Sequence, residues 1–409
     1  KGKTLIVIDP RKTELAKYAN YHLQLRPGTN VAILNMMLHY IIFEGLDNKE
    51  FIEGRTEGYE AFKQQMLSLN MDELEAITGV DKSLVRKAAI AYATAGNAMS
   101  FHGLGVTEHS QGTHTVMLIA DLAMITGNIG RRGVGVNPLR GQNNVQGACD
   151  MGSFPHELPG YRHISNPETR AIYENLWGVK LKEKPGMRIP NMLDAAVAGE
   201  YMGIYIHGED IAQSDPNTQH VTAGLAAMEM VIVQDLFLNE TAKYAHVFLP
   251  GTSFLEKDGT FTNAERRINR VRPTMPSKTG KEEWEVTCDL AKAMGYNMHY
   301  DNAAQIMDEI AATTPTFKGV SHARLDAEGS MQWPVNDNAP DGTPIMHIEK
   351  FVRGTGNFML TPYVATEEKT NRKFPLLLTT GRVLSQYNVG AQTRRTENNV
   401  WHPEDTLDI

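Results

Sequence analysis

This sequence contains little cysteine, no long apolar run and no excess of cations. Its two cysteines, Cys149 and Cys288, lie far apart and in no metal-ligand spacing. This argues against a disulfide framework and favours a reducing compartment, so we expect a cytoplasmic location. The net charge of −8 argues against a nucleic-acid partner. No apolar run approaches the roughly 18 residues of a membrane span, so we expect none.

The common catalytic motifs are also missing from the sequence. It has no Walker A loop, no Gly-x-Gly-x-x-Gly placed directly after a strand, no Gly-x-Ser-x-Gly elbow, no His-Glu-x-x-His and no Cys-x-x-Cys. The spacings between His102, His109 and His114 do not place all three on one helical face, so we assign them no metal. If the protein is an enzyme, its reactive centre therefore belongs to a cofactor.

The sequence does contain an alternation of short apolar strands and helices, which predicts an α/β fold with a mostly parallel sheet. Strands are predicted within residues 3–10, 98–106, 201–210, 225–237 and 244–251. Helices are predicted within residues 29–46, 71–80, 81–96, 112–130 and 282–295, with Asp81 as the cap of the third and a Schellman-type Gly127 at the end of the fourth. The pattern weakens between residues 251 and 346, and the run 374–382 predicts one further strand.

One stretch of sequence occurs twice. The segments VIDPRKTELAKYA (7–19) and VQDLFLNETAKYA (233–245) share identical residues at a constant offset of 226, among them Asp9/Asp235, Ala16/Ala242, Lys17/Lys243, Tyr18/Tyr244 and Ala19/Ala245. Two units with similar strand–turn–helix chemistry would explain this, and so would a duplicated nucleotide-binding unit. In open α/β sheets, ligands lie beyond the carboxyl ends of the strands, where each copy carries its aspartate.

The segment GVNPLRGQNNVQGACDMG (135–152) combines four glycines and five amide side chains with one cation, Arg140. A guanidinium fork matches carboxylates and phosphates, and glycines let the backbone approach a ligand. The alternative is a structural loop between two domains, with Arg140 in a salt bridge. Upstream, Gly103 and Gly105 follow a predicted strand, so their N–H groups either meet a phosphate or form a plain strand–helix turn.

Residues 135–152 resemble the signature of molybdopterin-dependent formate dehydrogenases, in the dimethyl sulfoxide reductase superfamily. Residues 103–130 resemble the segment that precedes this signature in the family. The run LLTTGRVLSQYNVGAQTRRT (377–396) resembles the family's C-terminal cap domain, especially in the catalytic (alpha) subunit of soluble NAD-linked formate dehydrogenases.

The resemblance implies molybdenum or tungsten held by two molybdopterin guanine dinucleotides. It also implies four domains in this chain: a first dinucleotide-binding Rossmann-like domain with a parallel sheet (1–142), a related second one (143–253), a smaller mixed α+β connecting domain (254–350) and the start of a C-terminal β-barrel cap domain (351–409).

The implied reaction is the two-electron oxidation of formate to CO2, or its reverse, with Arg140 orienting formate. Electrons then pass through iron–sulfur clusters to partner subunits carrying flavin and NAD. The cofactor-binding residues implied are Asp9, Arg11, Gly28 and Asn30 near one guanosine end, Gly105 and Gln142 near pterin or phosphate, Gly208, Asp210, Gln234 and Asp235 on the second dinucleotide, and Gly381, Arg382, Tyr387 and Asn388 from the cap domain.

The family's Cys or selenocysteine metal ligand and the cysteines of its 4Fe-4S cluster match no residue here, so we name no metal ligand. We therefore expect a fragment that does not oxidise formate alone. Two alternatives stay open: another oxidoreductase of the superfamily, such as a nitrate reductase, or a non-catalytic scaffold like the relative in respiratory complex I. The Arg-Gly-Gln-Asn-Asn run argues against the first, and the polar residues at both presumed guanine ends argue against the second.

Overall fold

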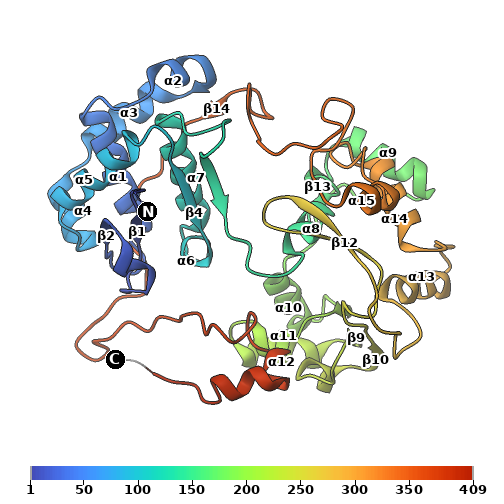
Figure 1. The fold of residues 1–409 in the computed structure, drawn as a ribbon. Coiled ribbons are helices and arrows are strands. Elements are labelled where there is room, and N and C mark those ends of the chain that lie inside the picture. The colour runs from blue at the N-terminus through green and yellow to red at the C-terminus, as the bar shows by residue number, and fades with distance from the viewer. Residues whose placement is uncertain (1, 408–409) are drawn as a thin grey trace. The chain divides into compact units, whose positions relative to one another are not determined.

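The computed structural model describes residues 2–407, which form two compact units. The first unit runs to Leu139 and takes up the chain again at residues 345–381, and the second comprises residues 140–344 and the chain from Arg382 onward. Helices and short parallel sheets occur in both, as Figure 1 shows in chain order by colour. The mixed α/β class with parallel sheets is thus confirmed, and the division into four domains stays a prediction.

The first unit is built around helix α1, which is buried over nearly all of its length and packs against α3, α4, α5 and α7. Its short strands pair in parallel as β1–β2, β4–β5 and β14–β3. Its elements are β1 (Ile6–Ile8), η1 (Leu15–Tyr18), β2 (Tyr21–Leu23), α1 (Asn30–Phe43), α2 (Lys49–Arg55), β3 (Thr56–Glu57), α3 (Tyr59–Ser68), α4 (Met71–Thr78), α5 (Lys82–Ala93), β4 (Met99–His102), α6 (Leu104–Thr107), α7 (Gly112–Ile125), β5 (Gly135–Pro138) and β14 (Gly356–Asn357).

Local chemistry sets the ends of these helices. Asp81 caps α5 because its Oδ1 accepts from the backbone N–H groups of Ser83 and Leu84. At the end of α7, Gly127 adopts φ 64°, a left-handed conformation that glycine takes without strain. Its N–H donates to Met124 O, and the next N–H donates to Ala123 O, which completes a Schellman motif. Both ends are confirmed as predicted.

The second unit contains a parallel sheet of order β10–β9–β8, covered on one face by α10 and α12. A separate antiparallel sheet, β11–β12–β13, has its own small core. The elements are α8 (Val145–Asp150), β6 (Glu157–Leu158), β7 (Arg162–His163), α9 (Pro167–Trp177), α10 (Ile189–Val197), β8 (Gly203–His207), α11 (Ile211–Ser214), α12 (Thr218–Ala227), β9 (Met230–Asp235), η2 (Thr241–Tyr244), β10 (Val247–Pro250), β11 (Gly259–Thr262), β12 (Arg267–Val271), α13 (Glu283–Ala293), α14 (Ala303–Thr313), α15 (His322–Glu328), β13 (Met331–Gln332), η3 (Thr393–Arg395) and η4 (Glu397–Trp401).

The repeated sequence forms the same structure twice. Ile6 of β1 pairs with Tyr21 of β2, and Ile232 of β9 pairs with Val247 of β10, so both strand pairs keep the offset of 226. The two 3₁₀ helices between the strands, η1 and η2, keep it as well. The copies differ in one respect: β9 pairs with strands on both edges, whereas within residues 2–407 β1 pairs with β2 alone.

The strand predicted for residues 374–382 is wrong. The segment has no regular structure, and its leucines Leu376 and Leu378 are 68% and 77% exposed. A strand forms only where another strand satisfies its backbone N–H and C=O groups, and no described residue pairs with this segment. The apolar run therefore indicates strand propensity without supplying a partner.

Candidate functional site

Arg140 follows β5 at the start of the signature loop, and its guanidinium faces helix α8. Its Nε donates to Gln146 Oε1 at 3.3 Å, and its Nη2 lies 3.5 Å from Cys149 Sγ. Within residues 2–407 no carboxylate forms a salt bridge with Arg140, so the salt-bridged loop that the sequence left open is not what the described residues form. The cation keeps donors that an anionic ligand can use.

Asp150, at the end of α8, accepts hydrogen bonds from the polar side chains next to Arg140. It is 1% exposed, and its Oδ1 accepts from Gln146 Nε2 and from the Tyr161 hydroxyl, each at 2.8 Å. Its Oδ2 accepts from Trp333 Nε1 at 2.8 Å. Burial raises the pKa of Asp150, while these three donors and the charge of Arg140 oppose that rise. No pattern in the sequence indicated a role for this carboxylate.

The carboxyl ends of β8 and β9 bring together two of the predicted cofactor residues. Gln234 is fully buried, and its Oε1 accepts from the Tyr205 hydroxyl, while its Nε2 has no partner among the described residues. The N–H of Gly208 donates to Gln234 O at 2.8 Å. Gly208 adopts φ 67° and faces open space, so backbone is accessible here.

Two predicted acids beside them are engaged within the fold. Asp210 accepts from Thr241 through its backbone N–H (2.9 Å) and its hydroxyl (2.6 Å). Asp235 accepts from Leu236 N at 2.6 Å and from Asn239 Nδ2 at 2.9 Å. Burial raises the pKa of Asp235, and its backbone donors oppose the rise. Asp210 thus ties β8 to η2, and any role of either acid toward a ligand stays a prediction.

In the first unit the predicted residues form two small groups. Asp9 Oδ1 accepts from the backbone N–H of Arg11 at 2.7 Å, and a Cβ at Gly381 would collide with Arg11 Nη1. Asn30 Nδ2 donates to Gly105 O at 3.1 Å. The fold therefore joins Arg11 with Gly381, and Asn30 with Gly105, across long sequence separations.

Gly28, just before α1, lies outside these groups and has φ 81°. In the second unit the Tyr387 hydroxyl accepts from the backbone N–H of Asn143, next to Gln142 in the signature loop, at 2.7 Å. Arg382 Nη1 lies 3.5 Å from the carbonyl oxygen of Asn388. The side chain of Gln142 is exposed.

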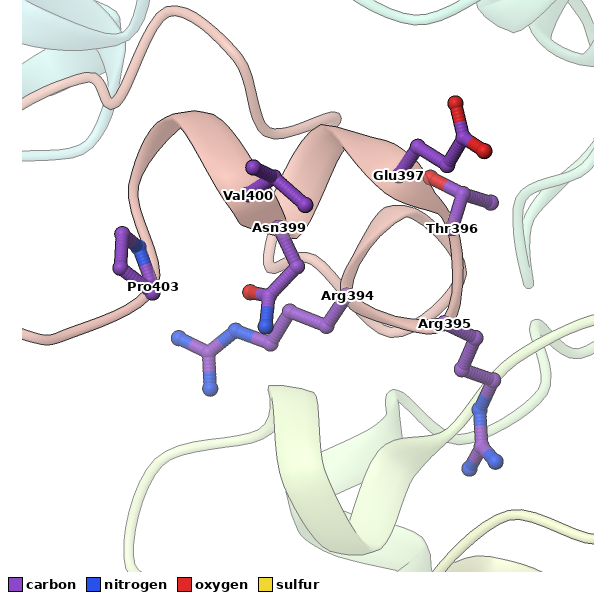
Figure 2. A pocket seen from close by; sticks show the side chains of 7 residues that line it. All are labelled: Arg394, Arg395, Thr396, Glu397, Asn399, Val400 and Pro403. Atoms are coloured by element: carbon purple, nitrogen blue, oxygen red, sulfur yellow. The ribbon is translucent and has the colours of Figure 1, made fainter.

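Arg395 lies near the predicted residues of β9 but is not itself among the predicted cofactor-binding residues. It leaves η3 with its guanidinium 5.2 Å from the ring centroid of Phe237, just beyond β9, and its charge opposes the rise that burial causes in the pKa of Asp235. Figure 2 shows it beside Arg394, which leaves the same turn in another direction. The open pocket there, about 610 Å³, is lined by Arg394, Arg395, Thr396, Glu397, Asn399, Val400 and Pro403. The paired arginines of TRRT were the available signal.

Comparison with known proteins gives the family. The model of the family described as "Molybdopterin oxidoreductase" matches residues 1–293. This chain belongs to the molybdopterin oxidoreductase family. It is 42% identical over 403 residues to the F420-dependent formate dehydrogenase subunit alpha of Methanocaldococcus jannaschii, covering 97% of this chain and 59% of that relative. It is 40% identical over 398 residues to formate dehydrogenase H of Escherichia coli, covering 96% of this chain and 56% of that protein.

This molybdopterin oxidoreductase chain thus spans less than two thirds of the length of these relatives. Among solved structures, acetylene hydratase from Pelobacter acetylenicus is similar with a TM-score of 0.63 and 22% identity, over 79% of this chain and 47% of that one. At this identity the similarity concerns the fold alone. Within residues 2–407 no helix is long and apolar enough to cross a membrane.

The described residues fit a molybdopterin group. The buried Nε2 of Gln234 is a donor without an acceptor, a state that costs about 1–3 kcal/mol unless a ligand supplies one. Arg140 and Arg395 are cations that suit phosphates or other anions. No set of three or more His, Cys, Asp or Glu residues in the described part of the chain could hold a metal. The unpaired amide donor of Gln234 and the two arginines suit the organic part of such a cofactor.

Proposed function

We propose that this chain is the larger part of the catalytic alpha subunit of a formate dehydrogenase. The observation that carries the proposal is Arg140, a guanidinium in the signature loop with no carboxylate partner among the described residues. The names of the relatives from Methanocaldococcus jannaschii and Escherichia coli point to the same reaction. The reaction is the oxidation of formate to CO2, or its reverse.

We propose a molybdenum or tungsten ion with two molybdopterin guanine dinucleotides as the cofactor, which supplies the two-electron redox chemistry when bound. A 4Fe-4S cluster would lie in the full-length protein, with ligands outside this chain. The residues of this chain that would hold the dinucleotides are Asp9, Arg11, Gly28, Asn30, Gly105, Gln142, Gly208, Asp210, Gln234, Asp235, Gly381, Arg382, Tyr387 and Asn388, to which we add Arg395.

Two related Rossmann-like domains, at residues 1–142 and 143–253, would each hold one dinucleotide. The duplicated strand–3₁₀–strand motif supports this, because each copy ends its first strand near an aspartate. Residues 254–350 would form the connecting domain, and residues 351–409 would begin the barrel cap domain.

Arg140 would bind formate with its forked N–H groups. Formate has two oxygens and one C–H bond, so a fork that holds both oxygens leaves the C–H hydrogen pointing away from the guanidinium. The positive charge offsets the carboxylate, and the neutral amides around it offer no acid to protonate the substrate. The arginine and its loop would thus bind and orient formate, and the redox chemistry would be supplied by the cofactor.

The electrons would pass through iron–sulfur clusters to flavin and NAD in partner subunits. The TGR…QYN…TRRT run supports this acceptor through its resemblance to NAD-linked enzymes. F420 is the alternative acceptor, since the name of the Methanocaldococcus relative carries it. Reduction of NAD and of F420 by the complete complex would distinguish them.

Replacing Arg140 in the full-length protein tests the substrate assignment. We expect Arg140→Ala to lower kcat/KM for formate-dependent dye reduction at least about 30-fold, because truncating one partner of a hydrogen-bonded charge pair that the full enzyme encloses costs roughly 2–5 kcal/mol. Arg140→Lys should recover only part of this, since an ammonium has no fork. Arg132→Lys, at an exposed arginine before β5, is the control. Near-normal formate kinetics in both Arg140 variants would overturn the proposal.

Two further measurements separate the other candidates. Nitrate reduction without formate oxidation would indicate an oxyanion reductase. Iron at full occupancy without molybdenum or tungsten would indicate a non-catalytic scaffold.

A further inference from the structure

The side chain that fixes Arg140 is an amide, Gln146, and this amide is itself held by a buried carboxylate. We infer that Asp150 is a positioning residue for formate binding, which acts on Arg140 through Gln146. The inference rests on the proposed function, because it assigns a task to the residues behind the formate-binding arginine. Among the described residues no carboxylate contacts the guanidinium directly, so the negative charge of Asp150 acts on it through the intervening Gln146 amide.

The orientation of the Gln146 amide follows from its partners. Gln146 is 8% exposed, and its Nε2 donates to Asp150 Oδ1 (2.8 Å) and to the Tyr161 hydroxyl (2.9 Å). The Tyr161 proton is committed to Asp150, so that hydroxyl can only accept from Gln146. Both partners thus require the NH₂ end of the amide, which leaves Oε1 facing Arg140. A reversed amide would set donor against donor at the guanidinium.

The carboxylate is in turn fixed by donors. Gln146 and Tyr161 donate to its Oδ1, and Trp333 donates to its Oδ2. Three convergent donors suit an ionised carboxylate and hold it in one position. Because Tyr161 and Trp333 come from other parts of the second unit, the network anchors α8 as well as the amide.

This arrangement determines which donors of Arg140 remain for a ligand. Its Nε is used by Gln146, and its Nη2 approaches Cys149 Sγ. Within residues 2–407 nothing hydrogen-bonds Nη1. The Nε side of the guanidinium therefore faces α8, and its outer end, with Nη1 and the second hydrogen of Nη2, is left for the two oxygens of formate. A rotated amide would release Nε and let the fork turn.

The test uses Asp150→Asn in the loaded full-length enzyme. An asparagine can present NH₂ to Gln146, so the amide loses its single orientation. We expect KM for formate to rise about tenfold with kcat changed less than about threefold, because orientation of the binding fork is lost and not the chemistry. The Kd of acetate, a carboxylate that cannot react, should rise by a similar factor when measured by calorimetry. Metal content should stay unchanged.

A second variant tests the same inference without altering Asp150, in case Asp150→Asn fails to fold. Gln146→Met conserves volume and leaves Tyr161 and Trp333 on the carboxylate, so it should raise KM and the acetate Kd alike. Asp308→Asn, at an exposed acid on α14, is the matched control. A lower Tm with unchanged KM and acetate Kd in both variants would show a structural role only and overturn the inference. If Arg140→Ala also leaves KM unchanged, the proposed function itself fails.

Discussion

Trp333 donates its indole N–H to Oδ2 of Asp150 at 2.8 Å, although the two residues lie 183 positions apart. Trp333 follows β13 and Asp150 ends α8, so the hydrogen bond connects helix α8 to the antiparallel sheet β11–β12–β13 of the second unit. The indole also packs near Phe317 and Tyr161. One side chain thus provides both a hydrogen bond and apolar packing behind Arg140.

Trp333→Phe should lower the stability of the second unit by about 1–3 kcal/mol, since it keeps aromatic area and leaves a buried carboxylate oxygen unpaired. The measurement is Tm by calorimetry on the full-length protein. Trp401→Phe is the control, because Trp401 is 80% exposed and donates no hydrogen bond within the described chain. Equal Tm values for both variants would contradict the prediction.

Asp121, 1% exposed in α7, should make stability fall as pH rises. Burial raises its pKa to about 8, and the backbone N–H of Met359 offsets only part of that rise. The folded state therefore keeps a proton that the unfolded chain, with a pKa near 3.9, has released, and stability decreases between about pH 4 and pH 8 by up to about 1.4 kcal/mol per pH unit. Asp121→Asn should flatten this dependence in Tm measured from pH 5 to pH 8, whereas Asp308→Asn should not. A parallel slope in wild type and Asp121→Asn would contradict it.

Gly105→Ala should separate folding from cofactor binding. A Cβ at Gly105 meets no atom within 4 Å, and its φ is not left-handed, so the free energy of unfolding of the chain without cofactor should stay within about 1 kcal/mol of wild type. If backbone at Gly105 approaches the pterin or a phosphate, the added methyl should reduce molybdenum or tungsten content after assembly. Gly54→Ala in α2, also in open space, serves as control. Full metal content in Gly105→Ala would remove this residue from the site.

The two copies of the repeated motif should differ in hydrogen exchange. Tyr21 N donates to Leu5 O, so alternate residues of β1 face β2, and the amides of Ile6 and Ile8 face the other edge. Their equivalents, Ile232 and Gln234, face β8. In the 409-residue chain we expect Ile6 and Ile8 to exchange faster, because local opening is easier at an unpaired edge. Equal protection would contradict the register described above.

Much of the fold follows from local patterns. The apolar run of α1, the aspartate before α5 and the glycine after α7 each act within a few residues, so the sequence predicts them correctly. The identities at offset 226 also predict a repeated structure, and the register of β1–β2 and β9–β10 confirms it. The strand at residues 374–382 fails because pairing depends on a neighbour, which propensity does not supply.

The candidate site divides in the same way. The sequence alone determined the family signature, the cation Arg140 and the absence of an acid–base set, because these depend on residue types and their spacing. Only the tertiary structure decided that Arg140 rests on an amide, that Asp150 collects donors from Tyr161 and Trp333, and that Arg395 reaches Phe237. These contacts join residues far apart in the chain, and their partners are selected by packing and by the need to satisfy buried polar atoms, which no local pattern encodes.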